Sequence, residues 1–274
     1  MTKRRSFDRD YILAEIEKLS TSITKPTKIF IIGGLSMMQH DLKDATKDID
    51  VVVVGTKDLE LLIDALVRMK YEILGADLIT HQYVKMETSK IMQNKDGFRW
   101  DIFYGKICNK LTFSTNMSQR AIEFYSRGNI TLAIASKEDI FLFKGITERE
   151  ADLNDMRLLV ESGIDWQVVK EECRYQSDIS GKLWEDALVQ NLIDLRTKYK
   201  IKSPIEKELT KLCEEKMAED RILKSIASGH ITFKEISGDT TLEYYYVREQ
   251  IKRMTKKRLL IIDRKYRPYT VSLV

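Results

Sequence analysis

The sequence is poor in cysteine, proline and glycine, with 3, 3 and 12 of them among 274 residues. So few Gly and Pro residues argue against collagen-like repeats and long disordered linkers. The cysteines, Cys108, Cys173 and Cys213, lie far apart, and none belongs to a CxxC motif or a Cys/His cluster. Because zinc sites and disulfide frameworks need such spacings, we expect neither and interpret the cysteines as buried or incidental thiols.

Long apolar runs are also missing. The run Ile49–Val54 is among the longest, and it is far shorter than the roughly 20 residues that cross a bilayer. The N-terminal segment MTKRRSFDRD has basic residues but no apolar stretch behind them, so we expect no signal peptide. With 43% hydrophobic and 32% charged residues, the composition is typical of a globular protein with a charged surface. We therefore expect a cytoplasmic protein without membrane partners.

The periodicity of apolar residues changes along the chain. The first half mixes strands with helices, whereas the spacing after Ser136 is helical. The pattern predicts a helix at 8–19, a strand at 28–32, a helix at 35–42, a strand at 49–54, a helix at 59–69, a β-hairpin at 83–104, and helices at 137–144, 152–161, 166–175 and 182–199. A break follows at Ser203-Pro204. This order predicts an α/β (α+β) core with a mixed sheet, followed by a helical region.

Two acidic residues open the most apolar of these predicted strands. Asp48 and Asp50 are two positions apart, so their side chains project from one face at a spacing of roughly 7 Å. Ile49 and Val51 point to the opposite face. Carboxylates this close repel each other unless a cation lies between them. We expect Mg²⁺, or Mn²⁺ in its place, because Mg²⁺ binds a few carboxylate oxygens together with waters and phosphates.

A glycine pair lies just before these acids. Gly33 and Gly34 end the preceding predicted strand and allow the backbone to approach a phosphate closely. They also open onto a helix N-terminus, where N–H groups without helical partners favour an anion. Ser36 adds a hydroxyl donor for a terminal phosphate. Phosphoryl and nucleotidyl transfer depend on positioning the phosphates and on neutralising their charge. The glycine pair, Ser36 and the two acids with their cation could together supply both.

A third acid, Asp101, lies in the apolar run Phe98–Phe103. By strand alternation its immediate neighbours point to one face and Asp101 points to the other. An acid within such a strand needs a partner or a metal. We predict that Asp101 binds the catalytic metal and assists the attacking hydroxyl. The alternatives are a surface loop for the Asp-x-Asp motif and a strand edge for Asp101, but the order of these elements favours a functional origin.

The run GGLS…TKDIDVVV resembles the signature of the DNA polymerase β-type nucleotidyltransferases: a Gly-Gly/Ser turn, a spacer and Asp-x-Asp. The TKDID form and the segment 144–155 are similar to the AbiEii-like and related minimal nucleotidyltransferases, several of which act in toxin–antitoxin or phage-defence systems. In that branch a Lys, an Arg and a spaced Asp pair follow the core. Here these are Lys144, Arg149, Asp152 and Asp155, and the resemblance implies that Lys144 contacts nucleotide phosphates. An ordinary charged helix is the alternative for this segment.

The C-terminal end is basic. Residues 239–274 contain nine Lys or Arg and four Asp or Glu residues, a net charge of +5, whereas the whole chain carries +4. Such a concentration of positive charge is typical of a surface that attracts nucleic acid. A solvated helix face is the alternative, because Lys and Arg usually lie at surfaces.

The pattern in this basic region predicts helices and a β-ribbon. A helix stripe ends at Gly229, Thr232 starts a capping box for a short helix, and Thr240 starts a second cap pattern for a longer helix. Two β runs follow, at 259–262 and 269–273. The order of these elements resembles a winged helix-turn-helix domain.

This second resemblance implies contacts with nucleic acid. Arg248 and Lys252 on the long predicted helix would face a groove, and Arg264 and Lys265 in the wing would reach phosphates. The alternative role of such a domain is dimerisation, or packing on the catalytic core.

Together, these patterns predict a nucleotidyltransferase core at 1–145, a helical region at 146–210 and a winged-helix domain at 211–274. The predicted enzyme transfers a nucleoside monophosphate from an NTP to a hydroxyl of RNA or protein. Its expected partners are NTP, that acceptor, DNA at the C-terminal domain, and a second copy of the chain. The competing predictions are an inactive DNA-binding regulator or antitoxin-like protein that kept the fold, and a neutralising partner that acts by protein contact.

Overall fold

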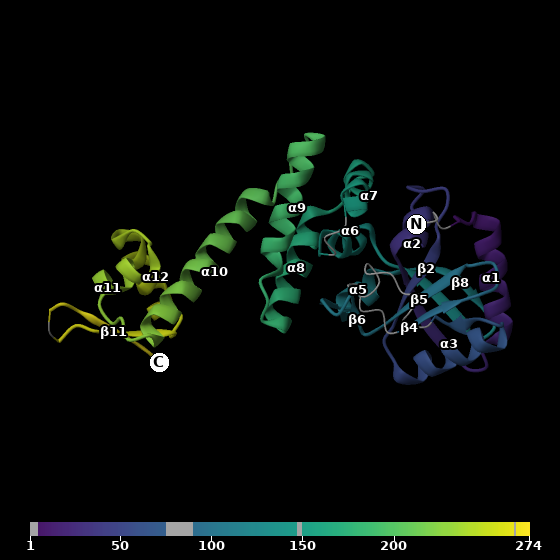
Figure 1. Cartoon of the computed structure of the whole chain (residues 1–274), viewed down its shortest axis with the longest axis horizontal. Coiled ribbons are helices and arrows are strands. Elements are labelled where there is room, and N and C mark those ends of the chain that lie inside the picture. Colours follow the sequence, from purple (N-terminus) through teal and green to yellow (C-terminus); the bar gives the residue numbers. More distant parts are fainter. Residues whose placement is uncertain (1–4, 75–89, 147–149, 266) are drawn as a thin grey trace. The chain divides into compact units, whose positions relative to one another are not determined.

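The chain forms two compact units, residues 1–205 and 206–274, in the computed structural model (Figure 1). The structure describes residues 5–74, 90–146, 150–265 and 267–274. Arg149 and the first part of the predicted hairpin, 83–89, lie outside the described residues. No helix in the described ranges is long and apolar enough to span a membrane.

The first unit begins with alternating helices and strands and ends in helices. In chain order its described elements are α1 (Arg9–Ser22), β1 (Thr27–Ile32), α2 (Gly33–Gln39), β2 (Asp48–Val53), α3 (Thr56–Arg68), β3 (Glu72–Ile73), β4 (Lys90–Gln93), β5 (Arg99–Tyr104), β6 (Lys106–Ile107), β7 (Leu111–Thr112), α5 (Thr115–Arg120), β8 (Ile122–Arg127), β9 (Ile130–Ile134), α6 (Lys137–Ile146), α7 (Glu150–Glu161), α8 (Trp166–Ser180) and α9 (Trp184–Tyr199). The predicted helices and strands are confirmed, with ends shifted by a few residues. The elements between β5 and α6 were not predicted.

A seven-stranded mixed sheet organises the described part of the first unit, with strand order β3-β4-β5-β2-β1-β9-β8. β1 pairs in parallel with β9, and β2 with β5, whereas the other neighbours are antiparallel. β2 is the central strand, as its apolar residues on both faces predict. The predicted α/β class with a mixed sheet is therefore confirmed. The turn between β4 and β5 also matches its Asp-Gly signal, since Gly97 has a φ of +82°.

One face of this sheet packs against α1 and α3. The apolar stripes of these helices meet alternate residues of the central strands, and each fully buried side chain contributes roughly 1.5–3 kcal/mol. Members of this core are Ile12, Ile16, Leu19, Ile29, Ile31, Ile49, Val51, Leu62, Leu66, Trp100 and Ile102. The intervening residues of the same strands, among them Asp48, Asp50 and Asp101, therefore point to the opposite face.

Buried polar contacts fasten the helical part of the first unit to its sheet part. The side-chain amide of Gln176 on α8 donates to the Thr112 carbonyl at 2.8 Å and accepts from the Thr112 N–H at 2.9 Å. Arg120, at the end of α5, donates to Asp139 on α6 at 2.6 Å and to Glu172 on α8 at 2.7 Å. Both carboxylates are buried, so Arg120 neutralises charges that water does not reach.

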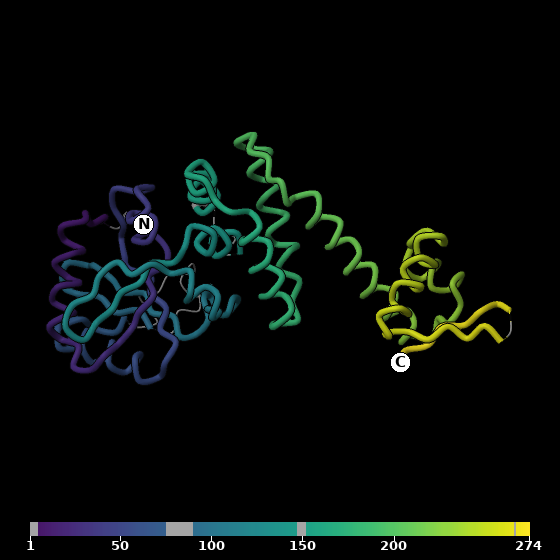
Figure 2. The backbone as a smooth tube through the Cα atoms, turned by 180° about the vertical axis from the view of Figure 1, so that it is seen from behind, coloured from purple at the N-terminus to yellow at the C-terminus, as the bar shows by residue number. Residues whose placement is uncertain are grey.

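The second unit contains three helices and a hairpin, which extends past the helices in Figure 2. These elements are α10 (Glu206–Ala227), α11 (Phe233–Thr240), α12 (Tyr244–Lys256), β10 (Leu260–Asp263) and β11 (Thr270–Leu273). Their apolar faces share one core, which includes Ile222, Ile236, Val247, Ile251, Leu260 and Val271. Thr232, between α10 and α11, forms an isolated antiparallel bridge with Thr270 of the hairpin.

One of the two predicted helix caps in this unit is present. Thr232 and Glu235 form the predicted capping box at the start of α11. The predicted cap at Thr240 is wrong, because α11 continues to Thr240 and its hydroxyl donates to the Ile236 carbonyl at 2.6 Å. Thr241 then ends the helix with a φ of +57°, and α12 begins three residues later at Tyr244.

Candidate active site

Four chain segments meet at one end of the sheet. β1 and β9 are parallel, and both end there, at Ile32 and Ile134. β2 runs antiparallel to β1 and begins there at Asp48, and β5, which is parallel to β2, begins there at Arg99. The glycine turn follows β1, and α6 follows β9. Residues far apart in the chain are therefore brought to one edge of the sheet, and the predicted site residues that follow β1 and those on β2 and β5 lie at or next to it.

The predicted acids lie next to each other in the backbone at this edge. Asp50 on β2 is the direct register partner of Asp101 on β5, and Asp48 is the partner of Arg99. Register partners on adjacent strands point to the same face, as do residues two apart on one strand. All three carboxylates therefore belong to the face opposite α1 and α3. Asp101 is only 1% exposed, whereas Asp48 and Asp50 are partly exposed.

The glycine turn is in contact with the second of these acids. Gly33 has a φ of +64°, and a Cβ at this position would lie 2.0 Å from Asp50 Oδ2. Both the backbone conformation and the available space therefore require glycine. A Cβ on Gly34 would lie 2.4 Å from Thr46 Oγ1. Each glycine of the pair thus lets one part of the segment 46–50 approach the backbone of the turn.

Ser36 is fully buried on α2, a helix of seven residues. Its hydroxyl donates to the Ala135 carbonyl at 3.2 Å, and His40 Nε2 lies 3.1 Å from the same oxygen. These contacts fasten α2 to the end of β9. The predicted contact of Ser36 with a terminal phosphate therefore requires its side chain to rotate.

Lys144 is buried on α6 and pairs with two carboxylates. Its Nζ lies 2.7 Å from Asp152 Oδ1 and 2.8 Å from Asp155 Oδ2, both on α7. Asp155 also pairs with Lys43, which belongs to the loop between α2 and β2, at 2.7 Å. The sequence resemblance pointed to Lys144, Asp152 and Asp155, but it did not indicate Lys43. A contact between residues so distant in the chain leaves no periodic signal.

A family model described as a nucleotidyltransferase of unknown function (DUF6036) matches residues 10–203. The chain belongs to this family. The matched region contains the glycine turn, the three acids and the Lys144 cluster, whereas the second unit lies beyond it. No curated protein matches the chain. The predicted membership in a nucleotidyltransferase family is therefore confirmed, whereas the AbiEii-like branch stays a prediction. The edge of the sheet just described is the candidate active site.

The donor set of this nucleotidyltransferase fits Mg²⁺ in chemical type, because Mg²⁺ prefers a few carboxylate oxygens and leaves room for phosphates. Asp48, Asp50 and Asp101 supply such oxygens from one face of the sheet. Within the described ranges, however, no three Asp, Glu, His or Cys side chains are gathered closely enough to hold an ion. Binding of a metal by all three acids therefore requires their carboxylates to turn toward one another.

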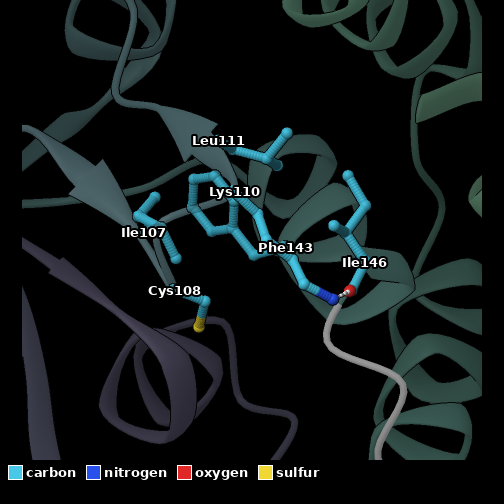
Figure 3. A pocket seen from close by; sticks show the side chains of 6 residues that line it. All are labelled: Ile107, Cys108, Lys110, Leu111, Phe143 and Ile146. Atoms are coloured by element: carbon cyan, nitrogen blue, oxygen red, sulfur yellow. Dashed lines mark hydrogen bonds between the residues drawn. The ribbon is translucent and has the colours of Figure 1, made fainter. Parts of the chain in front are cut away.

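A hollow lies beside the β6–β7 turn (Figure 3). Its lining side chains are Ile107, Cys108, Lys110, Leu111, Phe143 and Ile146. The Lys110 ammonium donates to the Ile146 carbonyl at 2.7 Å, and the Cys108 thiol is buried and free of disulfide. Cys173 and Cys213 are buried as well, as predicted. The lining of the hollow is mainly apolar, and nothing in it suits a triphosphate.

Proposed function

We propose that this nucleotidyltransferase transfers a nucleoside monophosphate from an NTP to a hydroxyl of RNA or protein, with pyrophosphate leaving. The register of Asp50 beside Asp101, next to the glycine turn, is the observation that supports this proposal most. Adjacent carboxylates on one face repel each other, and a bound cation would relieve this repulsion. A triphosphate accompanied by magnesium brings such a cation.

Each residue of the site has a distinct proposed role. Asp48, Asp50 and Asp101 would hold Mg²⁺ or Mn²⁺, which when bound neutralises phosphate charge and favours deprotonation of a hydroxyl. We assign the role of assisting the attacking hydroxyl to Asp101, the most buried of the three. Gly33 and Gly34 keep side chains away from the path of the NTP phosphates. The absence of a side chain at Gly33 also lets Asp50 lie against the turn.

Label transfer tests the proposed reaction. The purified protein is incubated with each α-³²P-labelled NTP, Mg²⁺, and either total RNA or a protein extract. We expect label on one class of acceptor, and none with the Asp48→Ala/Asp50→Ala variant. Asp64→Asn is the matched control, because Asp64 is exposed on α3 at the other face of the sheet. Equal transfer by the double variant and the wild type would refute the assignment of the acids.

The second unit favours a second activity, the binding of duplex DNA. Residues 206–274 contain 15 Lys or Arg and 11 Asp or Glu residues, so the whole surplus of +4 in the chain falls here. A helix, an isolated β-bridge residue, two helices and a hairpin follow in an order that resembles a winged helix-turn-helix. The buried side of α12 carries Val247, Gln250, Ile251 and Met254, so its opposite side faces solvent.

Not all of the basic residues on α12 are equally suited to phosphates. Arg253 pairs with Glu215 on α10 at 2.7 Å, and Lys257 pairs with Glu219 on the same helix. These two cations serve the packing of α10 against α12. Arg248 is exposed and lies one turn before Lys252 on the solvent side of α12, where Lys252 pairs with the exposed Glu249 of the same helix, at 2.6 Å. We therefore propose that Arg248 and Lys252 contact DNA, together with the exposed Arg264 and Lys265 beyond β10.

The salt dependence of DNA binding tests this second proposal. Fluorescence anisotropy with a labelled duplex gives the affinity at several salt concentrations. We expect Arg248→Ala/Lys252→Ala to weaken binding and to reduce the salt slope by about two, since each phosphate contact contributes about 0.9. Arg253→Ala, which removes the same kind of charge, should leave the slope nearly unchanged. DNA binding without any label transfer would favour the inactive regulator, and the toxin–antitoxin setting stays a prediction.

A further inference from the structure

Lys43 belongs to an ion-pair cluster that joins three segments of the first unit. Its ammonium lies 2.7 Å from Asp155 Oδ1 and 2.8 Å from Asp155 Oδ2. The Lys144 ammonium lies 2.8 Å from the same Oδ2 and 2.7 Å from Asp152 Oδ1. Asp152 and Asp155 are three residues apart on α7, so they share one face of that helix. Asp155 therefore holds two ammonium groups, one from α6 and one from the loop before β2.

Burial within this cluster is uneven. Lys144, Asp152 and Asp155 are buried, whereas the Lys43 side chain is 29% exposed. Removing four charges from water costs several kcal/mol per ion, and the ion pairs do little more than offset this cost. The cluster is therefore a weak source of folding stability. Lys43 can also leave Asp155 without stranding a buried carboxylate, because Asp155 keeps its contact with Lys144.

The loop that carries Lys43 is fixed beside the candidate active site. Leu42 N–H donates to the Met37 carbonyl of α2 at 2.9 Å. Thr46 exchanges two backbone hydrogen bonds with Phe7, at 2.7 and 3.1 Å. The loop follows the helix that starts at the glycine turn, and it leads directly into the first acid of β2. In the chain, Lys43 therefore lies between the two motifs assigned to the triphosphate and the metal.

We propose that Lys43 binds the distal phosphates of the NTP, an inference that rests on the proposed nucleotidyl transfer. On binding, the Lys43 ammonium exchanges its contact with Asp155 for phosphate oxygens, for which a flexible ammonium is a common protein partner. No covalent bond changes in this exchange. Because Lys43 would contact the distal phosphates, its contribution to affinity should be larger for an NTP than for an NMP. A lysine that only fastens the loop to α7 would instead affect folding and treat all nucleotides alike.

Calorimetric titration distinguishes these two roles. Wild-type protein is titrated with ATP, CTP, GTP and UTP in the presence of Mg²⁺, and the tightest of them is compared with its monophosphate. For Lys43→Gln we expect about tenfold weaker NTP binding, the loss of one charge-assisted hydrogen bond, and less than about threefold weaker NMP binding. Lys43→Arg should restore most of the affinity. Lys137→Gln is the matched control, since Lys137 fastens α6 by donating to the Ser162 carbonyl at 2.9 Å.

Each outcome of this titration decides the question. Equal weakening of NTP and NMP binding by Lys43→Gln would overturn the inference and show a structural role. A wild type that binds none of the four NTPs would overturn the proposed function and this inference with it. If Lys43→Gln does not fold, amine labelling of the wild type decides instead. Protection of Lys43 by NTP but not by NMP supports phosphate binding, and equal labelling with both contradicts it.

Discussion

Replacing Gly33 by alanine tests the contact between the glycine turn and Asp50. The φ of Gly33 is +64°, and a Cβ would lie 2.0 Å from Asp50 Oδ2 and 2.7 Å from Asp50 Cγ. Both distances are far inside van der Waals contact. Either the Asp50 carboxylate must rotate away, or β1 and β2 must shift relative to each other. In both cases the Asp50 carboxylate is displaced from its position against the glycine turn.

The expected magnitudes follow from these two effects. A left-handed backbone costs alanine roughly 1–2 kcal/mol, and overpacking adds about 1–3 kcal/mol. Gly33→Ala should therefore lower the free energy of unfolding by roughly 2–5 kcal/mol, measured by denaturant unfolding. A displacement of a reacting group by about 1 Å costs about 100-fold in rate. Label transfer by the folded variant should fall by at least that factor.

Gly181→Ala is the matched control for backbone strain. Gly181 ends α8 with a φ of +67°, and no atom of the described residues lies within 4 Å of its ideal Cβ. This variant should lose roughly 1–2 kcal/mol of stability and keep its transfer rate. The label-transfer rates of the two variants are compared under conditions where both are folded. If the rate of Gly33→Ala is within threefold of the rate of Gly181→Ala, the position of Asp50 against the turn is not needed for transfer. The reasoning from Gly33 is then refuted.

Two further predictions concern charged groups away from the site. Arg120→Met should lower the free energy of unfolding at pH 7 by about 3–5 kcal/mol in denaturant titrations, because it strands the buried carboxylates of Asp139 and Glu172. Burial raises the pKa of Asp139 above its ordinary value, although Arg120 opposes this, so the folded state takes up a proton more readily than the unfolded state. The loss in Arg120→Met should therefore shrink as the pH falls through the raised pKa of Asp139; a loss that is constant with pH would contradict this. In the second unit, hydrogen bonds from Thr232 hold the pKa of Glu235 below its ordinary value. Ionised Glu235 therefore stabilises the start of α11 fully at pH values above its pKa in the unfolded state. This stabilisation is lost as the pH falls through its lower pKa in the folded state. Glu235→Gln should speed hydrogen exchange of the Ile231 and Thr232 amides at pH 7, with a smaller difference in acid; equal exchange at both pH values would show that the capping box does not depend on the charge of Glu235.

Much of the first unit is predictable because its signals are local. The alternation around Asp101 predicts that its neighbours point to the opposite face, and the structure confirms this, since Trp100 and Ile102 lie in the core beneath α1 and α3. The glycine pair and the acidic start of β2 are similarly visible as short patterns. The predicted strand at 49–54 lies at the centre of the sheet because both of its faces are apolar.

The remaining features depend on contacts between distant segments. β8 is an edge strand with mostly exposed or half-buried residues, so it has little hydrophobic alternation, and β9 is placed by its parallel pairing with β1. The pairing of Lys43 with Asp155 and the contact of Ser36 with Ala135 arise only after the sheet is assembled. Thr240 shows the opposite problem. Its local sequence fits a helix N-cap, but α11 continues past Gly238 and has Thr240 as its last residue.

The most direct test of the central claim is a crystal structure with Mg²⁺ and a non-hydrolysable analogue of the preferred NTP. We predict carboxylate oxygens of Asp48, Asp50 and Asp101 at about 2.1 Å from bound magnesium, with the phosphates beside Gly33. Carboxylates that remain turned away from a common ion, or a nucleotide bound at another edge of the sheet, would contradict the assignment of this site.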